Sequence, residues 1–295
     1  MKTKKKKLKR CYDGYQVPAP DALTLLQPYI LKRRTESQVM IDLEIDLTPI
    51  TAFIKEHKED MPGLTLYHII FAALVRAAST VPQINRFIAG SRVYQRRHVL
   101  ISMMVKRKLA LDGEETAIYP CFEPTDTLAD IVNKVNAATE EAFAAMHAEA
   151  GNPFDKLTGI LEKVPHPLLK MFLDLMLFLD SRGKLPKALV DMQPFHSSFY
   201  VTNVGSIGLP VIYHHLYEFG TCSGFLSMGA KETVCKLKPD GSVRTYRALP
   251  LKFVLDSRIC DGFTYATACK VIKKCLANPE VLMESYHPDW LDEEV

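Results

Sequence analysis

The sequence predicts an α/β fold in which a mixed β-sheet is covered by helices. Apolar and polar residues alternate over residues 38–46, the pattern of a half-buried strand. Residues 66–80 are apolar on nearly every side, which is typical of a helix buried against a sheet. From Phe199 onward, short apolar segments rich in β-branched and aromatic residues indicate further strands. Strands and helices do not alternate as regular βαβ units, so we expect a mixed sheet.

Length and composition are those of a soluble globular chain with one large core. The chain has 295 residues, of which 47% are hydrophobic, and this excludes disordered, collagen-like and disulfide-scaffold proteins. The formal net charge is +3, but the first ten residues carry seven basic groups, so residues 11–295 carry −4. A mildly acidic body argues against a nucleic-acid partner.

The sequence predicts a cytoplasmic protein. The most apolar run, residues 168–179, is 12 residues long and contains Lys170 and Asp174, whereas a spanning helix needs about 20 residues. The charged N-terminus is not followed by the apolar stretch of a signal peptide. The seven cysteines include no C-x-x-C pair, and we expect reduced thiols.

In order along the chain, we expect a basic flexible tail at 1–20 and a single domain over 21–295. The tail is either disordered or a contact for anionic lipid or RNA. After the strand at 38–46 and the helix from Thr65, residues 98–105 read as a second strand. Thr127-x-x-Asp130 resembles a capping box and opens an amphipathic helix.

Five prolines interrupt the segment from about 150 to 195, which we expect to be a helical insertion. Its apolar run is either buried or the surface of a lid, partner or membrane contact. Residues 238–242 (KPDGS) predict a hairpin turn between two strands. A final helix follows Gly262 and ends before Asn278-Pro279.

Two places carry residues with potential chemistry. The segment 256–262 (DSRICDG) sets polar residues between an apolar strand and a helix, where Asp256 and Asp261 either serve function or cap and salt-bridge the structure. Adjacent His214 and His215 are potential bases or a solvated, hydrogen-bonded pair. Nucleotide-binding and zinc motifs are absent, so the sequence predicts no metal site.

The segment DSRICDG followed by Phe263 resembles the signature of coenzyme A-dependent acyltransferases related to chloramphenicol acetyltransferase. It also resembles the catalytic domains of the dihydrolipoyl acyltransferases of 2-oxo acid dehydrogenase complexes. Those families carry H-H-x-x-x-D-G or D-H-R-x-x-D-G, and this chain keeps Asp256, Arg258, Asp261 and Gly262. FYVTNVGSIG and GFLSMGAKE are similar to two further family segments. The similarity extends over about 20–150 and 196–280.

The resemblance implies the chloramphenicol acetyltransferase-like two-layer sandwich, a mixed β-sheet flanked by helices. It also implies a homotrimer with active sites between subunits, coenzyme A or acyl-coenzyme A as substrate, and a small-molecule acyl acceptor. The oxyanion donor then falls on Thr202 and the structural carboxylate on Asp261. The family's catalytic base falls on Ser257.

Ser257 is the main departure from the family, because a serine does not accept a proton as a neutral imidazole does. The segment HHLYEFG imitates the signature, but Phe219 stands where Asp is needed. No lipoyl-attachment motif is present in the sequence, and we expect a free-standing domain whose coenzyme A-binding residues the sequence does not identify.

Three interpretations stay open. The first is an acyltransferase whose base comes from elsewhere, with His214 or His215 as candidates and His215 slightly preferred. The second is a catalytically inactive paralogue that binds acyl-coenzyme A or assists assembly. The third, which we favour least, is a protein that docks on a membrane surface through its tail and residues 168–179.

Overall fold

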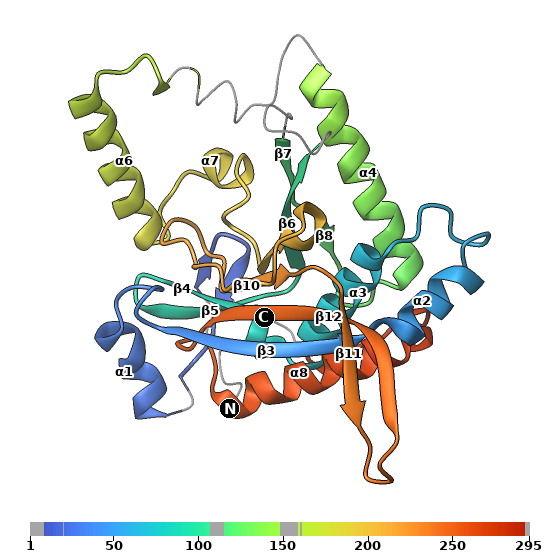
Figure 1. Cartoon of the computed structure of the whole chain (residues 1–295). Helices are drawn as coiled ribbons and strands as arrows, with labels where there is room; N and C mark the ends of the chain where they lie inside the picture. The colour runs from blue at the N-terminus through green and yellow to red at the C-terminus, as the bar shows by residue number, and fades with distance from the viewer. Residues whose placement is uncertain (1–8, 20, 107–114, 148–158, 160, 293–295) are drawn as a thin grey trace.

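The computed structural model of the chain describes residues 9–19, 21–106, 115–147, 159 and 161–292. Its main sheet is mixed, as the sequence predicts (Figure 1). The strand order is β11-β12-β10-β9-β6-β7, with β3 paired to β12 and β8 paired to β6. The strands are β3 (Gln38–Asp46), β6 (Val99–Lys106), β7 (Glu115–Ile118), β8 (Cys121–Phe122), β9 (Phe199–Asn203), β10 (Gly224–Met228), β11 (Glu232–Leu237) and β12 (Val243–Asp256).

Strand β12 organises the main sheet. Its first half pairs with β11 through the predicted turn, where Gly241 has a φ of +81°. Its second half lies between β3 and β10 and is antiparallel to both. Strand β9 runs parallel to both β10 and β6. The two directions together make the sheet mixed.

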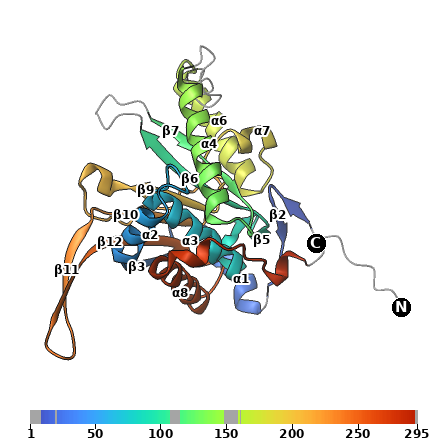
Figure 2. The same cartoon turned by 90° about the vertical axis from the view of Figure 1, so that its right-hand side faces the viewer.

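Helices cover one face of this sheet (Figure 2). They are α2 (Leu47–Glu56), α3 (Leu66–Thr80), α4 (Leu128–His147) and α8 (Gly262–Ala277). Alternate strand residues such as Leu43, Val201 and Leu226 pack with these helices in one core. The predicted capping box forms at Thr127, whose backbone N–H donates to the Oδ2 of Asp130 at 2.9 Å.

Over β9, β10 and β12, the opposite face of the sheet is covered by a loop. Tyr200, Phe225 and Val254 form a small buried cluster there with Leu216 and Cys222. We call residues 209–222 the covering loop. The two faces of the sheet therefore differ: helices pack on one face, and the covering loop packs on the other.

The N-terminal segment differs from the expected tail. Residues 1–8 and 20 lie outside the described residues, but residues 9–19 include two strands of a second sheet with order β1-β2-β5-β4. These strands are β1 (Arg10–Cys11), β2 (Gly14–Gln16), β4 (Arg86–Ala89) and β5 (Arg92–Arg96). The N-terminal hairpin pairs with residues some 80 positions later, a contact that local patterns do not reveal.

The insertion is helical where the structure describes it, with α6 (His166–Ser181) and α7 (Lys187–Asp191). Helix α6 stands away from the main sheet (Figure 1). Most of its apolar side chains are exposed within a single chain, among them Leu168, Met171, Leu175 and Phe178. Of the alternatives left open by the sequence, the structure excludes burial within a single chain. In the described part of the chain, no helix has both the length and the apolar character needed to span a membrane.

A buried ionic cluster joins three distant segments. Asp256 is fully buried, and its carboxylate accepts hydrogen bonds from Nε and Nη2 of Arg258 at 2.8 and 2.6 Å. The Nε of Arg34 lies 4.0 Å from the same carboxylate, and Ser37 donates to it at 3.2 Å. Arg34 follows α1 (Ala22–Ile30). The cluster thus ties the end of β12 to the segment between α1 and β3.

Replacing Asp256 with Ala should lower the free energy of unfolding by about 3–5 kcal/mol, because two buried guanidinium groups lose their counter-charge. Urea denaturation measures this change. The matched control is Asp174→Ala, which removes an exposed i,i+4 pair with Lys170 and should change stability little. Equal unfolding midpoints for the two variants would contradict the structural role of the cluster.

Candidate active site

Strand β9 sets Thr202 on the loop-covered face of the sheet. Tyr200 and Thr202 share this face because Val201, between them, packs into the helical core. The chain turns immediately afterwards into η2 (Val204–Ile207), where Asn203 accepts from the backbone N–H of Ser206 at 3.1 Å. A side chain at Gly205 would meet the carbonyl oxygen of Gly229 at 2.2 Å, so this close approach needs glycine.

Thr202 belongs to a polar row that crosses the sheet. In register with it lie Ser227 of β10, then Lys252 of β12, then Asp42 of β3. The Ser227 side chain is fully buried, and its hydroxyl has no hydrogen-bond partner among the described residues. Tyr213 of the covering loop closes the row by donating its hydroxyl to Asp42 at 2.5 Å. Two neighbouring hydroxyl groups therefore face the covering loop.

His214 lies over the same face. Its ring stacks on Phe225 with centroids 4.1 Å apart and planes 11° from parallel. Phe225 precedes Ser227 by two residues, about 7 Å along the strand. The Nδ1 atom of His214 lies 2.9 Å from the carbonyl oxygen of His215. Because a carbonyl only accepts, Nδ1 carries the proton, and in the neutral ring Nε2 is left with a free lone pair.

The electrostatic setting of His214 favours the neutral ring. Burial holds its pKa below the ordinary value of 6.5, and the hydrogen bond to the His215 carbonyl offsets this shift only in part. His215 itself is exposed and packs edge-on against Tyr217. Of the two candidate bases, His214 therefore has the fixed tautomer and the sheltered position.

Ser257 and Asp261 follow the C-terminal end of β12, beyond this row. The backbone N–H of Ser257 donates to the carbonyl oxygen of Ser37 at 2.9 Å, and Gln27 donates to the Ser257 carbonyl oxygen at 3.2 Å. Asp261 is exposed and caps α8 by accepting from the N–H of Thr264 at 2.8 Å. Hydrogen bonds from Thr264 hold the pKa of Asp261 below its ordinary value.

Within one chain, Thr202 and Ser257 do not meet. The row of Thr202 crosses β12 at Lys252, five positions before Ser257, which corresponds to about 16 Å along the strand. Two strand spacings, about 10 Å, separate them sideways. The structure brings Thr202 and His214 to one face and leaves Ser257 apart.

Sequence reasoning missed Ser227 and Lys252 in the polar row. Each interrupts an otherwise apolar strand segment, GFLSM and LKFVL respectively. That interruption could have indicated both residues, because burying a hydroxyl or ammonium group in a strand costs free energy unless it is hydrogen-bonded.

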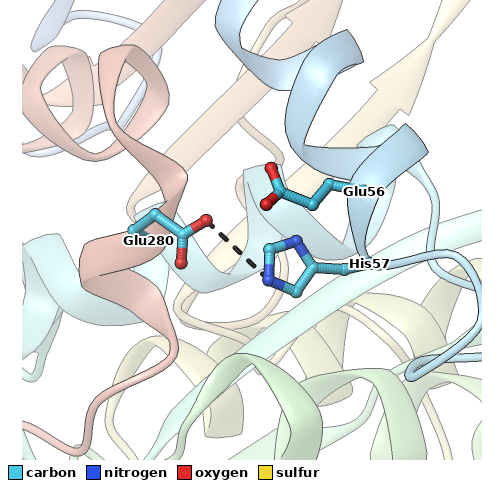
Figure 3. A group of neighbouring side chains, drawn as sticks. All are labelled: Glu56, His57 and Glu280. Atoms are coloured by element: carbon cyan, nitrogen blue, oxygen red, sulfur yellow. Dashed lines mark ion pairs between the residues drawn. The ribbon is translucent and has the colours of Figure 1, made fainter.

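One group of side chains has the composition of a metal site. Glu56, His57 and Glu280 offer ligand atoms within 4.8 Å of one another, and His57 Nε2 lies 3.8 Å from Glu280 Oε1 (Figure 3). Both carboxylates are exposed, and exposed acidic groups of this kind are common without an ion. The group belongs to the helical layer, on the opposite face from Thr202.

The fold is shared with solved structures of acyltransferases. The structure resembles the cubic core of the pyruvate dehydrogenase multienzyme complex with a TM-score of 0.55 at 17% identity, covering 88% of each chain. It resembles a dihydrolipoamide acetyltransferase of Azotobacter vinelandii equally, with the same values. Chloramphenicol acetyltransferase matches with a TM-score of 0.51 at 11% identity, covering 89% of this chain and 99% of that one. The fold is that of the coenzyme A-dependent acyltransferases.

Sequence comparison agrees with the fold. Residues 187–284 match the family model of the 2-oxoacid dehydrogenases acyltransferase catalytic domain. The chain is 24% identical over 271 residues to the dihydrolipoyllysine-residue acetyltransferase component of the acetoin cleaving system of Bacillus subtilis. That match covers 88% of this chain and 56% of the relative, so the chain spans about half the length of that relative. The C-terminal third of the sequence and the fold of the whole described chain thus both resemble the acyltransferase catalytic domain of 2-oxoacid dehydrogenases.

Proposed function

We propose that the protein transfers an acyl group between coenzyme A and a thiol, hydroxyl or amine acceptor, with Thr202 and His214 as its catalytic residues. The observation that carries this proposal is the position of both groups on one sheet face. The Nε2 of neutral His214 takes the proton of the acceptor, which attacks the thioester carbonyl. The C–S bond then breaks, and the imidazolium returns its proton to the departing coenzyme A thiolate.

Thr202 supplies electrostatic stabilisation in this mechanism. As the acceptor attacks, negative charge develops on the thioester oxygen, and a positioned hydroxyl donates to it. A threonine hydroxyl donates as a serine hydroxyl does. The buried Ser227 hydroxyl beside it is a second potential donor.

We further propose a homotrimer in which Ser257 of one subunit faces the Thr202 surface of the next. Helix α1, linked to Ser257 through Gln27, exposes five large apolar residues: Leu23, Leu25, Leu26, Tyr29 and Ile30. Exposed apolar groups of this density mark interaction sites. A cyclic assembly would bury them beside Ser257.

All seven cysteines are free thiols, which supports the cytoplasmic location that the sequence predicts.

Changing His214 to Ala should reduce turnover with acetyl-coenzyme A by roughly 10²–10⁴, the usual contribution of a positioned base. His215→Ala is the matched control and should change turnover little. The wild-type kcat/KM should fall as the pH drops below the His214 pKa, which burial places under 6.5, because the protonated ring accepts no proton. Equal turnover for the wild type and His214→Ala would show that His214 is not the catalytic base.

Changing Ser257 to His tests the alternative, an inactive paralogue that binds acyl-coenzyme A or assists assembly. The loss of the family base at this position is the observation that favours it. If the wild type is inert, Ser257→His should create transfer, and adding Thr202→Val should abolish it again. A folded Ser257→His protein that binds coenzyme A and transfers to no acceptor supports the inactive paralogue.

Changing Leu26 and Ile30 together to Asp should dissociate the assembly, because the charges would have to be buried in an interface. Light scattering should give about three times the chain mass of 33.3 kDa for the wild type and one chain mass for the variant. The control is Leu237→Asp, which is even more exposed and lies on the β11–β12 hairpin. A wild type that is monomeric at micromolar concentration would contradict the interfacial site.

A further inference from the structure

A cavity of about 640 Å³ lies inside the chain, next to the Thr202 face. Its floor is formed by Leu100 and Ser102 of β6, together with Tyr119 and Cys121. Residues from 183 to 197 close it from above, and residues 10–13 close one side. A cavity of this size suits a small organic molecule.

The floor of the cavity continues into the polar row. Ser102 is in register with Tyr200, which faces the covering loop as Thr202 does. The β6–β9 ladder continues to Met103 and Val201, and Thr202 is the next residue of β9 on the face of Tyr200. Alternate residues are about 7 Å apart along a strand. A molecule that contacts Ser102 in the cavity therefore ends about 7 Å along the strand from the row of Thr202.

The walls suit an uncharged molecule with an apolar body. Leu100, Leu185, Val190 and Pro194 line the cavity. The charged pairs at its edges are largely self-compensating: Arg96 contacts Asp13 at 2.7 Å, and Lys187 lies 3.9 Å from Asp191. Arg10 adds an exposed cation. An ionic ligand is therefore not required to balance the site.

Gln193 gives the cavity a hydrogen-bond donor. Its side chain is 93% buried, and its Oε1 accepts from the backbone N–H of Phe195 at 2.9 Å. Its Nε2 has no hydrogen-bond partner among the described residues. A buried amide group without a partner is costly, and a ligand oxygen would satisfy it.

The reactive side chains of the cavity are held in unreactive states. Burial raises the pKa of the Cys11 thiol to about 12 and that of Cys121 to about 11, and nearby carboxylates add to both shifts. Both thiols are therefore protonated at neutral pH and are poor nucleophiles. His196 is held between Asp180, whose Oδ1 lies 3.2 Å from its Nε2, and Thr221, whose Oγ1 lies 3.3 Å from its Nδ1. The cavity is built to bind, and the chemistry lies at Thr202.

We propose that this cavity holds the body of the acyl acceptor, an uncharged and mostly apolar alcohol, thiol or amine whose oxygen accepts a hydrogen bond from Gln193. The nucleophilic end of that molecule extends along the sheet to Thr202. The role of the occupant rests on the proposed acyltransferase function, whereas the binding of an apolar, oxygen-bearing molecule does not.

A binding experiment tests the cavity itself. The probe is prodan, an uncharged naphthalene ketone whose fluorescence shifts to the blue in apolar surroundings. We expect one molecule per chain, a loss of affinity of at least tenfold in Val190→Trp, which fills the cavity, and about three- to tenfold in Gln193→Leu, as for one hydrogen bond. Leu237→Trp adds the same ring on the exposed hairpin and should bind as the wild type does.

Binding to the exposed α6 helix is the competing outcome. If Leu175→Glu on α6 abolishes the blue-shifted signal and Val190→Trp leaves it intact, the probe is on the helix and the cavity proposal is overturned. Loss in Val190→Trp with retention in Leu175→Glu supports the cavity.

Kinetics separates the cavity from the proposed function. With acetyl-coenzyme A and a panel of alcohols, thiols and amines, Val190→Trp should raise the acceptor KM at least tenfold and leave coenzyme A binding unchanged by calorimetry. If transfer occurs and every acceptor KM is unchanged, the acceptor role of the cavity is overturned while the acyltransferase function stands. If no transfer occurs but the probe binds in the cavity, the acceptor role fails and a binding site is established.

Discussion

The buried carboxylate of Asp256 is the constraint on which the site depends. Its counter-charge Arg34 does more than neutralise it, since the same guanidinium donates to the backbone carbonyl oxygens of Tyr217, Glu218 and Gly220. One ionic cluster therefore fixes the end of β12 and the covering loop together. The loop in turn carries His214 over Phe225. The geometry of the candidate base is thus set by a buried charge at the C-terminal end of β12, two residues beyond the Val254 that pairs with Phe225.

Local patterns in the sequence predict the elements whose partners are dictated by hydrophobic periodicity. The strand at 38–46 has the bounds that alternation indicates, and the helix after Thr65 is buried as its composition requires. The second sheet escapes such analysis because its strands are short and its two hairpins pair with each other across some 80 residues. The position of α6 escapes it for a different reason, since apolar composition indicates that a helix needs a partner and does not say whether its own chain supplies one.

From the sequence, the family resemblance singles out Thr202 and strand alternation puts it on the face of Tyr200, while its catalytic role stays a prediction. The sequence does not separate His214 from His215, which differ only through a ring stacked on Phe225 and a carbonyl acceptor. Those contacts depend on the path of an irregular loop. Ser227 was missed because its importance comes from cross-strand register with Thr202, a property that neither residue shows alone.

The central place of β12 has a consequence for how the molecule forms. Its partner β3 precedes it by about 200 residues. The β3–β12 hydrogen bonds can therefore form only after the two ends of this long segment have come together. Chains dominated by such distant pairings fold slowly, because closure entropy is lost before contacts are gained. During synthesis, the strands between β3 and β12 emerge before the sheet can close around them, and their apolar edges stay exposed over that interval. The nascent chain is therefore most prone to aggregate before β12 has paired with its neighbours.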